Sequence, residues 1–172
     1  TLAVGAVSGT GTINDDDAAP TISSVSAATQ VEGTTLVHTV TLSNASSSVT
    51  TFAYTLGSGS ATGGGTDYTT PPTFSNGVTL SGGVLSVPAG VISFTVSVPS
   101  TQDTIDEGAS ETYNLSVGGV AAVGTITDDD NAPTISSVSS PTVSEGTNLV
   151  YAVTLSNASS SATTFAYSLG GG

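Results

Sequence analysis

The feature that most constrains this chain is an internal repeat with a period of 113 residues. The stretch Gly124-Thr-Ile-Thr-Asp-Asp-Asp-Asn-Ala-Pro-Thr-Ile-Ser-Ser-Val138 also occurs, with two substitutions, at Gly11–Val25. The same offset relates Thr41–Ser48 to Thr154–Ser161, and Phe52–Gly57 to Phe165–Gly170. Close similarity at a fixed period indicates an array of like units, each of ordinary domain size. We therefore expect three parts: residues 1–17, the C-terminal strand and linker of a preceding repeat; residues 18–130, one complete repeat; and residues 131–172, the N-terminal part of a following repeat.

The pattern inside the repeat is that of β-strands. Thr, Val, Ser and Gly dominate, and no stretch shows the apolar period of an amphipathic helix. Apolar and polar residues alternate instead in the runs 36–42, 52–56, 92–98 and 113–117. Clusters of Gly, Asn, Pro and Ser separate these runs, which is typical of turns between short strands. The sequence predicts an all-β fold, an antiparallel β-sandwich of about seven strands per repeat.

The charge of the chain excludes several classes of function. Thirteen residues are acidic and none is Lys or Arg, so the formal net charge is −13. Such a chain repels phosphate backbones, which excludes nucleic acid as a partner. No apolar run reaches the roughly 20 residues that cross a bilayer, so we expect no membrane insertion. The chain has no Cys, its Ser residues are too abundant to be diagnostic, and its single His lies in the middle of a predicted strand, so we expect no enzymatic activity.

The acidic residues are clustered near predicted strand ends. Strands that alternate in direction would bring nine of them to one end of the repeat, provided that the segment Thr69–Gly83 contains an even number of strands. An acidic surface suited to a salty habitat would explain the sign of the charge but not this clustering. The nine residues, which we call the acidic end, are Glu32, Asp67, Asp103, Asp106, Glu107, Glu111, Asp128, Asp129 and Asp130.

Nine carboxylates without a basic partner would either raise one another's pKa or bind a counter-ion. Oxygen ligands without Cys suit Ca²⁺, and shared carboxylates could hold about two or three ions. Zinc is disfavoured, because the only histidine, His38, lies in the middle of a predicted strand on its apolar face. His38 aligns with Tyr151 of the following repeat, so we predict that it fills the core or its rim.

Four motifs carry a resemblance to a known family. Val31-Glu32-Gly33, Gly65-Thr-Asp67-Tyr68, the run Asp103–Tyr113 and the closing Gly124–Asp130 resemble, in this order, the Calx-beta domain. The resemblance implies an immunoglobulin-like β-sandwich that binds calcium at the end carrying its C-terminal acidic run. It implies the following ligands: Glu32, Asp67, Asp103, Glu107, Glu111 and Asp128 to Asp130. This chain has Gln102-Asp103 where calcium-sensing members often have paired acids, and one extra residue before Glu111, so the number of ions stays open.

The tandem, Ser/Thr-rich composition resembles the extender regions of giant bacterial RTX-type surface adhesins. This second resemblance implies a calcium-stabilised structural repeat, or spacer, of a long extracellular protein at a bacterial cell surface. Its expected partners are calcium ions and the neighbouring repeats of the same chain, with calcium between repeats making the rod rigid. Lateral self-association in a fibre, matrix or biofilm is left open. Two alternatives remain: a calcium-sensing regulatory module, and a ligand-binding adhesion module.

Overall fold

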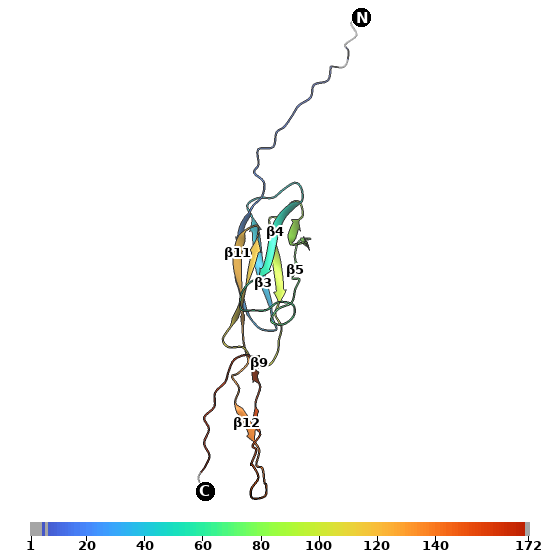
Figure 1. The fold of residues 1–172 in the computed structure, drawn as a ribbon. Helices are drawn as coiled ribbons and strands as arrows, with labels where there is room; N and C mark the ends of the chain where they lie inside the picture. Colours follow the sequence, from blue (N-terminus) through green and yellow to red (C-terminus); the bar gives the residue numbers. More distant parts are fainter. Residues whose placement is uncertain (1–4, 6, 171–172) are drawn as a thin grey trace.

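The structure, a computed structural model, describes residue 5 and residues 7–170. Figure 1 shows residues 18–130 as an elongated unit, with the N-terminal segment leaving one end and the C-terminal segment leaving the other. The strands are β1 (Ile22–Val25), β2 (Ala28–Val31), β3 (Thr35–Leu42), β4 (Thr50–Gly57), β5 (Thr73–Phe74), β6 (Thr79–Ser81), β7 (Val84–Val87), β8 (Ser93–Pro99), β9 (Ile105–Asp106), β10 (Glu111–Val117), β11 (Val120–Thr127), β12 (Ile135–Val138), β13 (Val153–Leu155) and β14 (Ala158–Ser159). The described residues contain no helix that is long and apolar enough to cross a membrane.

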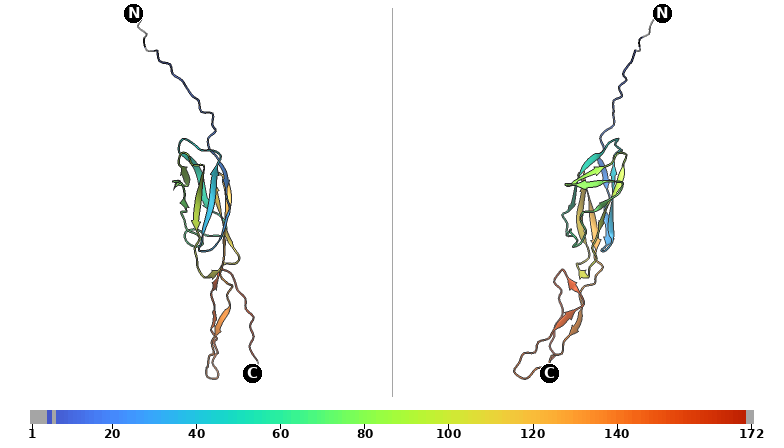
Figure 2. Two further views of the ribbon diagram at one scale, coloured as in Figure 1. Left: turned by 180° about the vertical axis from the view of Figure 1, so that it is seen from behind. Right: turned by 90° about the vertical axis from the view of Figure 1, so that its right-hand side faces the viewer.

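The complete repeat is an immunoglobulin-like β-sandwich, as the sequence predicts. One sheet has the order β1-β3-β8-β5, and the other has the order β2-β11-β10-β4-β7-β6. Alternation in β3 places Leu36 and Val40 inside with no exposed surface, and in β10 it does the same for Leu115 and Val117. The two layers of strands can be followed in the views of Figure 2.

The first strand of the repeat is not one continuous run. It is divided between the two sheets, because Ser26 closes the ladder between β1 and β3: its N–H donates to Thr39 O (2.9 Å), and its Oγ accepts the Thr39 N–H (2.7 Å). The chain then crosses to the other sheet, where β2 runs parallel to β11. The sandwich is therefore antiparallel except for this one pair among the strands of the complete repeat.

The segment Thr69–Gly83 contains two strands, so the predicted alternation of strand directions holds. Strand β5 pairs with β8 and strand β6 pairs with β7, both antiparallel. One detail of the predicted core is wrong, however. Ile92 precedes β8 and is 56% exposed, whereas Phe94, Val96 and Val98 of β8 are buried.

Outside residues 18–130, the strand pairing of the complete repeat recurs only in part. Strands β12 and β13 pair with the register of β1 and β3, including the same irregularity one residue after the first pair. In the described part of the chain no second sheet packs on them, and Tyr151 and Val153 are about half exposed. Residues 7–17 form no strand, and no other strand of the described residues lies beside them to pair with. Residues 1–4 and 6 lie outside the described residues, so the assignment of residues 1–17 to a preceding repeat stays a prediction.

Candidate metal centre

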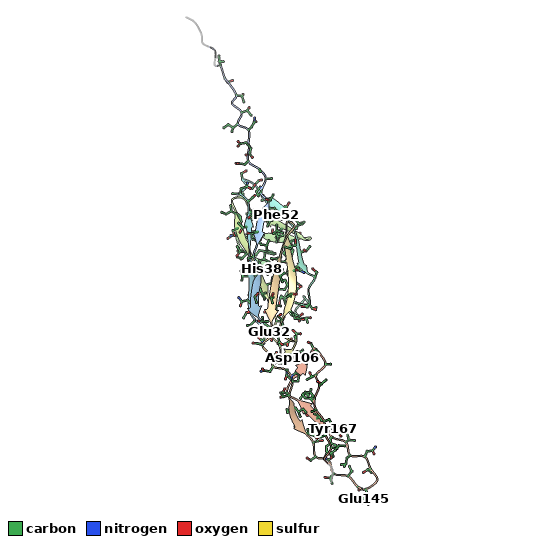
Figure 3. All side chains as sticks on the ribbon, turned by 90° about the vertical axis from the view of Figure 1, so that its left-hand side faces the viewer. Glu32, His38, Phe52, Asp106, Glu145 and Tyr167 are labelled. Carbon is green, nitrogen blue, oxygen red and sulfur yellow. The ribbon has the colours of Figure 1, made fainter. Side chains whose placement is uncertain are left out.

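The acidic end of the repeat lies where β2, β8 and β11 end and where β10 begins. Figure 3 shows Glu32 and Asp106 at this end, far from Phe52. Six of the nine predicted carboxylates form two groups of three, and within each group the carboxylate oxygens lie within 4.8 Å of one another. The first group is Glu32, Asp103 and Asp130; the second group is Asp67, Glu107 and Glu111.

Glu32 is the centre of the first group. The parallel pairing of β2 with β11 continues one residue further, since the Glu32 N–H donates to Thr127 O (3.0 Å) and fixes this residue beside the terminal acidic run. Its side chain is only 5% exposed. Burial raises the pKa of Glu32 to about 7, with added contributions from a hydrogen bond with Asp129 and from the charges of Asp103 and Asp130.

Gln102 belongs to this group, although in the sequence it stands out only as a missing acid. Its Nε2 donates to Glu32 Oε1 (2.8 Å) and to Asp129 Oδ1 (3.1 Å). The amide therefore supplies donors to two carboxylates that have no basic side chain to pair with. The sequence signal was present, because Gln102 directly precedes Asp103, but the contact with Glu32 spans 70 residues.

The second group is built around Asp67. This residue is 8% exposed, and its carboxylate accepts the N–H of Thr62. Its own carbonyl accepts the N–H of Thr101 (2.9 Å), which ties the loop after β4 to the loop after β8. The pKa of Glu111 is raised to about 7, mainly by burial. Its hydrogen bond with Asp67 and the charges of Asp67, Glu107 and Asp128 raise the pKa further. The pKa of Glu107 is also raised, first by burial and then by its acidic neighbours.

Asp128 and Asp129 lie beside the two groups. Asp128 accepts the N–H of Glu107 through Oδ2 (3.0 Å) and the N–H of Asp130 through Oδ1 (3.0 Å). Asp128 thus connects Glu107 of the second group to Asp130 of the first group. The pKa of Asp130 is raised by burial and by Asp128, Asp129 and Asp103, in that order, while a hydrogen bond with Glu32 opposes the shift.

Asp106, like Asp128 and Asp129, belongs to neither group of three. It lies in β9, and its Oδ2 accepts a hydrogen bond from Ser159 Oγ (2.9 Å) of the following repeat. Neighbouring positions of an extended chain point to opposite sides, so Asp106 and Glu107 cannot both face the second group. Counting strand directions brings a loop to the correct end but does not say which way each of its side chains points.

Two carboxylate oxygens provide a test of whether a cation suits these groups. Glu111 Oε2 and Asp130 Oδ2 are buried and have no hydrogen-bond partner, and one belongs to each group. A buried carboxylate oxygen without a donor is costly, and these carboxylates have no Lys or Arg to pair with anywhere in the sequence. All ligand atoms would be hard oxygens in irregular loops, which is the donor set that Ca²⁺ prefers. The residues therefore fit calcium.

His38 is part of the core, as predicted. It has no exposed surface, its Nδ1 lies 2.7 Å from Ser26 O, and its Nε2 lies 3.0 Å from Tyr113 Oη. Burial lowers the pKa of His38, partly opposed by the bond to Ser26. The Tyr113 ring also explains Gly124, because a Cβ there would lie 2.1 Å from Tyr113 Cζ.

Comparison with known proteins adds little to this description. No protein-family model matches the chain, and no curated protein matches it. Among solved structures, it is similar to the sixth cohesin of scaffoldin B from Acetivibrio cellulolyticus, solved in complex with a Cel5 dockerin mutant. The identity is 14%, the TM-score is 0.27, and the match covers 65% of this chain and 100% of that chain. A similarity of this size does not distinguish one kind of β-sandwich from another.

Proposed function

We propose that this chain is part of a calcium-stabilised spacer, an array of β-sandwich repeats that extends a bacterial surface protein away from the cell. The observation that carries the proposal is the pair of carboxylate groups, each with a buried oxygen that has no donor. Glu32, Asp103 and Asp130 would hold one ion, and Asp67, Glu107 and Glu111 would hold another. The resemblance to Calx-beta domains and to adhesin extenders supports the same function.

Bound calcium would supply the positive charge that the sequence lacks. The residues that hold it come from four separate segments of the repeat: the end of β2, the loop after β4, the segment from β8 to β10, and the run after β11. A shared ion would therefore add a further link between segments that hydrogen bonds already join, such as those from the Thr101 N–H to Asp67 O and from Gln102 Nε2 to Glu32 Oε1. Asp130 also lies directly before the following repeat, so the first group ties the junction to the sandwich.

Thermal unfolding in chelator and in calcium tests this proposal. An ion that binds only the folded state stabilises it by about 4 kcal/mol at a thousandfold excess over the dissociation constant. We expect the melting temperature of residues 18–130 within the whole chain to rise by roughly 10 °C or more on adding calcium. Magnesium, which requires a stricter octahedral site, should raise it much less. An unchanged melting curve in calcium would refute the proposal.

A further inference from the structure

The joint between the complete repeat and the following one contains a direct contact that involves no ion. Strand β9, Ile105–Asp106, pairs in parallel with β14, Ala158–Ser159. The backbone oxygen of Asp106 accepts the Ser160 N–H (2.9 Å) and Ser159 Oγ (3.0 Å), and its Oδ2 also lies 2.9 Å from Ser159 Oγ. This is where the C-terminal segment meets the sandwich at β9 in Figure 1.

The loop on the following repeat has the sequence Asn157-Ala-Ser-Ser-Ser161, which is identical to Asn44–Ser48 at the opposite end of the complete repeat. The two copies have the same internal hydrogen bonds. Ser46 Oγ accepts the Ser48 N–H (3.2 Å), and Ser159 Oγ accepts the Ser161 N–H (3.3 Å).

Each copy is also held against its own linker by its asparagine. Asn44 Nδ2 donates to Ala18 O (2.9 Å), and Asn157 Nδ2 donates to Asn131 O (2.8 Å). The second copy has β9 of the complete repeat beside it and contacts Asp106. The same internal bonds are therefore present in a copy that makes this contact and in one that has no β9 beside it in the described part of this chain.

From this geometry we infer that the loop Asp103–Glu107 of each repeat is a docking surface for the Asn-Ala-Ser-Ser-Ser loop of the next repeat, with Asp106 as its acceptor. Every complete repeat carries both halves of the contact, so it propagates along the array. The linker after Asp130 alone is one attachment and leaves rotation between repeats free. The β9–β14 contact is a second attachment, which restricts that rotation and leaves calcium at the junction to stiffen the joint further. This goes beyond the proposed function, because the contact is made by backbone and side-chain hydrogen bonds and by none of the six grouped carboxylates.

The chain offers a matched pair of variants to test the inference. Ser159→Ala removes the hydroxyl that donates to Asp106 and also the turn bond to Ser161. Ser46→Ala removes the equivalent turn bond to Ser48 and no contact between repeats. The chain has no Cys, so spin labels can be placed on cysteines introduced at the exposed positions Val37 and Thr154, one on each side of the joint. Pulsed electron paramagnetic resonance then gives the distribution of the distance between the labels.

In chelator, we expect Ser159→Ala to widen that distribution at least twofold and Ser46→Ala to leave it at the wild-type width. Asp106→Ala should widen it less, because the backbone acceptor remains, and the double variant should be no wider than Ser159→Ala alone. An unchanged distribution in Ser159→Ala would overturn the inference, and so would equal widening in Ser46→Ala. Because these measurements use no calcium, their outcome is separate from that of the melting experiment.

Discussion

Replacing Gln102 by glutamate tests how the first carboxylate group is balanced. Gln102 Nε2 donates to Glu32 Oε1 at 2.8 Å and to Asp129 Oδ1 at 3.1 Å. The Gln102→Glu variant loses both bonds and places a third carboxylate against two others. Hydrogen bonds to charged groups contribute about 1.5–3 kcal/mol when buried, and less here because Gln102 is exposed. Repulsion between charges about 4 Å apart adds roughly 1–4 kcal/mol.

We expect Gln102→Glu, in chelator at pH 8, to lose about 2–4 kcal/mol of stability. For a domain of this size that corresponds to a fall in melting temperature of roughly 10 °C. In calcium the new carboxylate becomes a further oxygen ligand. The difference in melting temperature between the variant and the wild type should then disappear, because calcium should raise the melting temperature of the variant more than that of the wild type.

Gln102→Ala is the matched control, because it loses the same two bonds without adding a charge. It should lose only about 1–2 kcal/mol in chelator, and calcium should not restore it. Circular dichroism melts of the three proteins, in chelator and in calcium, give the comparison. If Gln102→Glu and Gln102→Ala melted at the same temperature in both conditions, the charge at position 102 would not be part of a cation site, and the reasoning would fail.

Three other predictions concern the same end of the repeat. Glu111→Gln should reduce the calcium-induced rise in melting temperature by at least half, whereas Asp106→Asn should leave it unchanged; isothermal titration of both variants checks this. In chelator, stability should fall as pH rises from about 5 to 8, because folding raises the pKa values of Glu32 and Glu111 to about 7, so the folded state holds protons there that the unfolded state has released. His38, whose pKa is lowered, acts in the opposite direction below about pH 6.5, so urea melts across this range should show a smaller slope than the two glutamates alone would give. Small-angle X-ray scattering on a chain of four repeats should show a larger and more sharply defined maximum dimension in calcium than in chelator, and equal dimensions would confine the ions to a role inside each repeat.

Much of the fold could be predicted because its signals are local. The alternation of Leu36, His38, Val40 and Leu42 identifies a strand and its buried face, and all four are buried. The repeat period predicts where the junctions lie. The division of the first strand between two sheets could not be predicted, because it depends on Ser26 bonding to Thr39 across the sheet, and nothing in the residues around Ser26 indicates that partner.

The candidate site was predictable to the level of its loops. Strand directions alone brought Glu32, Asp67 and Asp130 to the same end, although they are far apart in sequence. The division into two groups depends on side-chain direction within short irregular loops, which the sequence pattern does not encode. The sequence therefore does not separate Asp106, which bonds to Ser159, from the six grouped carboxylates, and it does not show the role of Gln102, whose partners lie in other segments.

The parallel pairing of β2 with β11 determines how one repeat bears tension. The chain enters the sandwich through β1 and β2 and leaves through β11, and four residue pairs from Ala28↔Gly124 to Val31↔Thr127 join the entering and leaving strands. When the two ends of the chain are pulled apart, these parallel strands are pulled past each other along their length. The load then falls across all the hydrogen bonds of the pair at once instead of opening them one after another. The pairing of these two strands is therefore what resists stretching of the repeat. The carboxylates that follow the two strands, Glu32 after β2 and Asp128 to Asp130 after β11, lie where the pair ends.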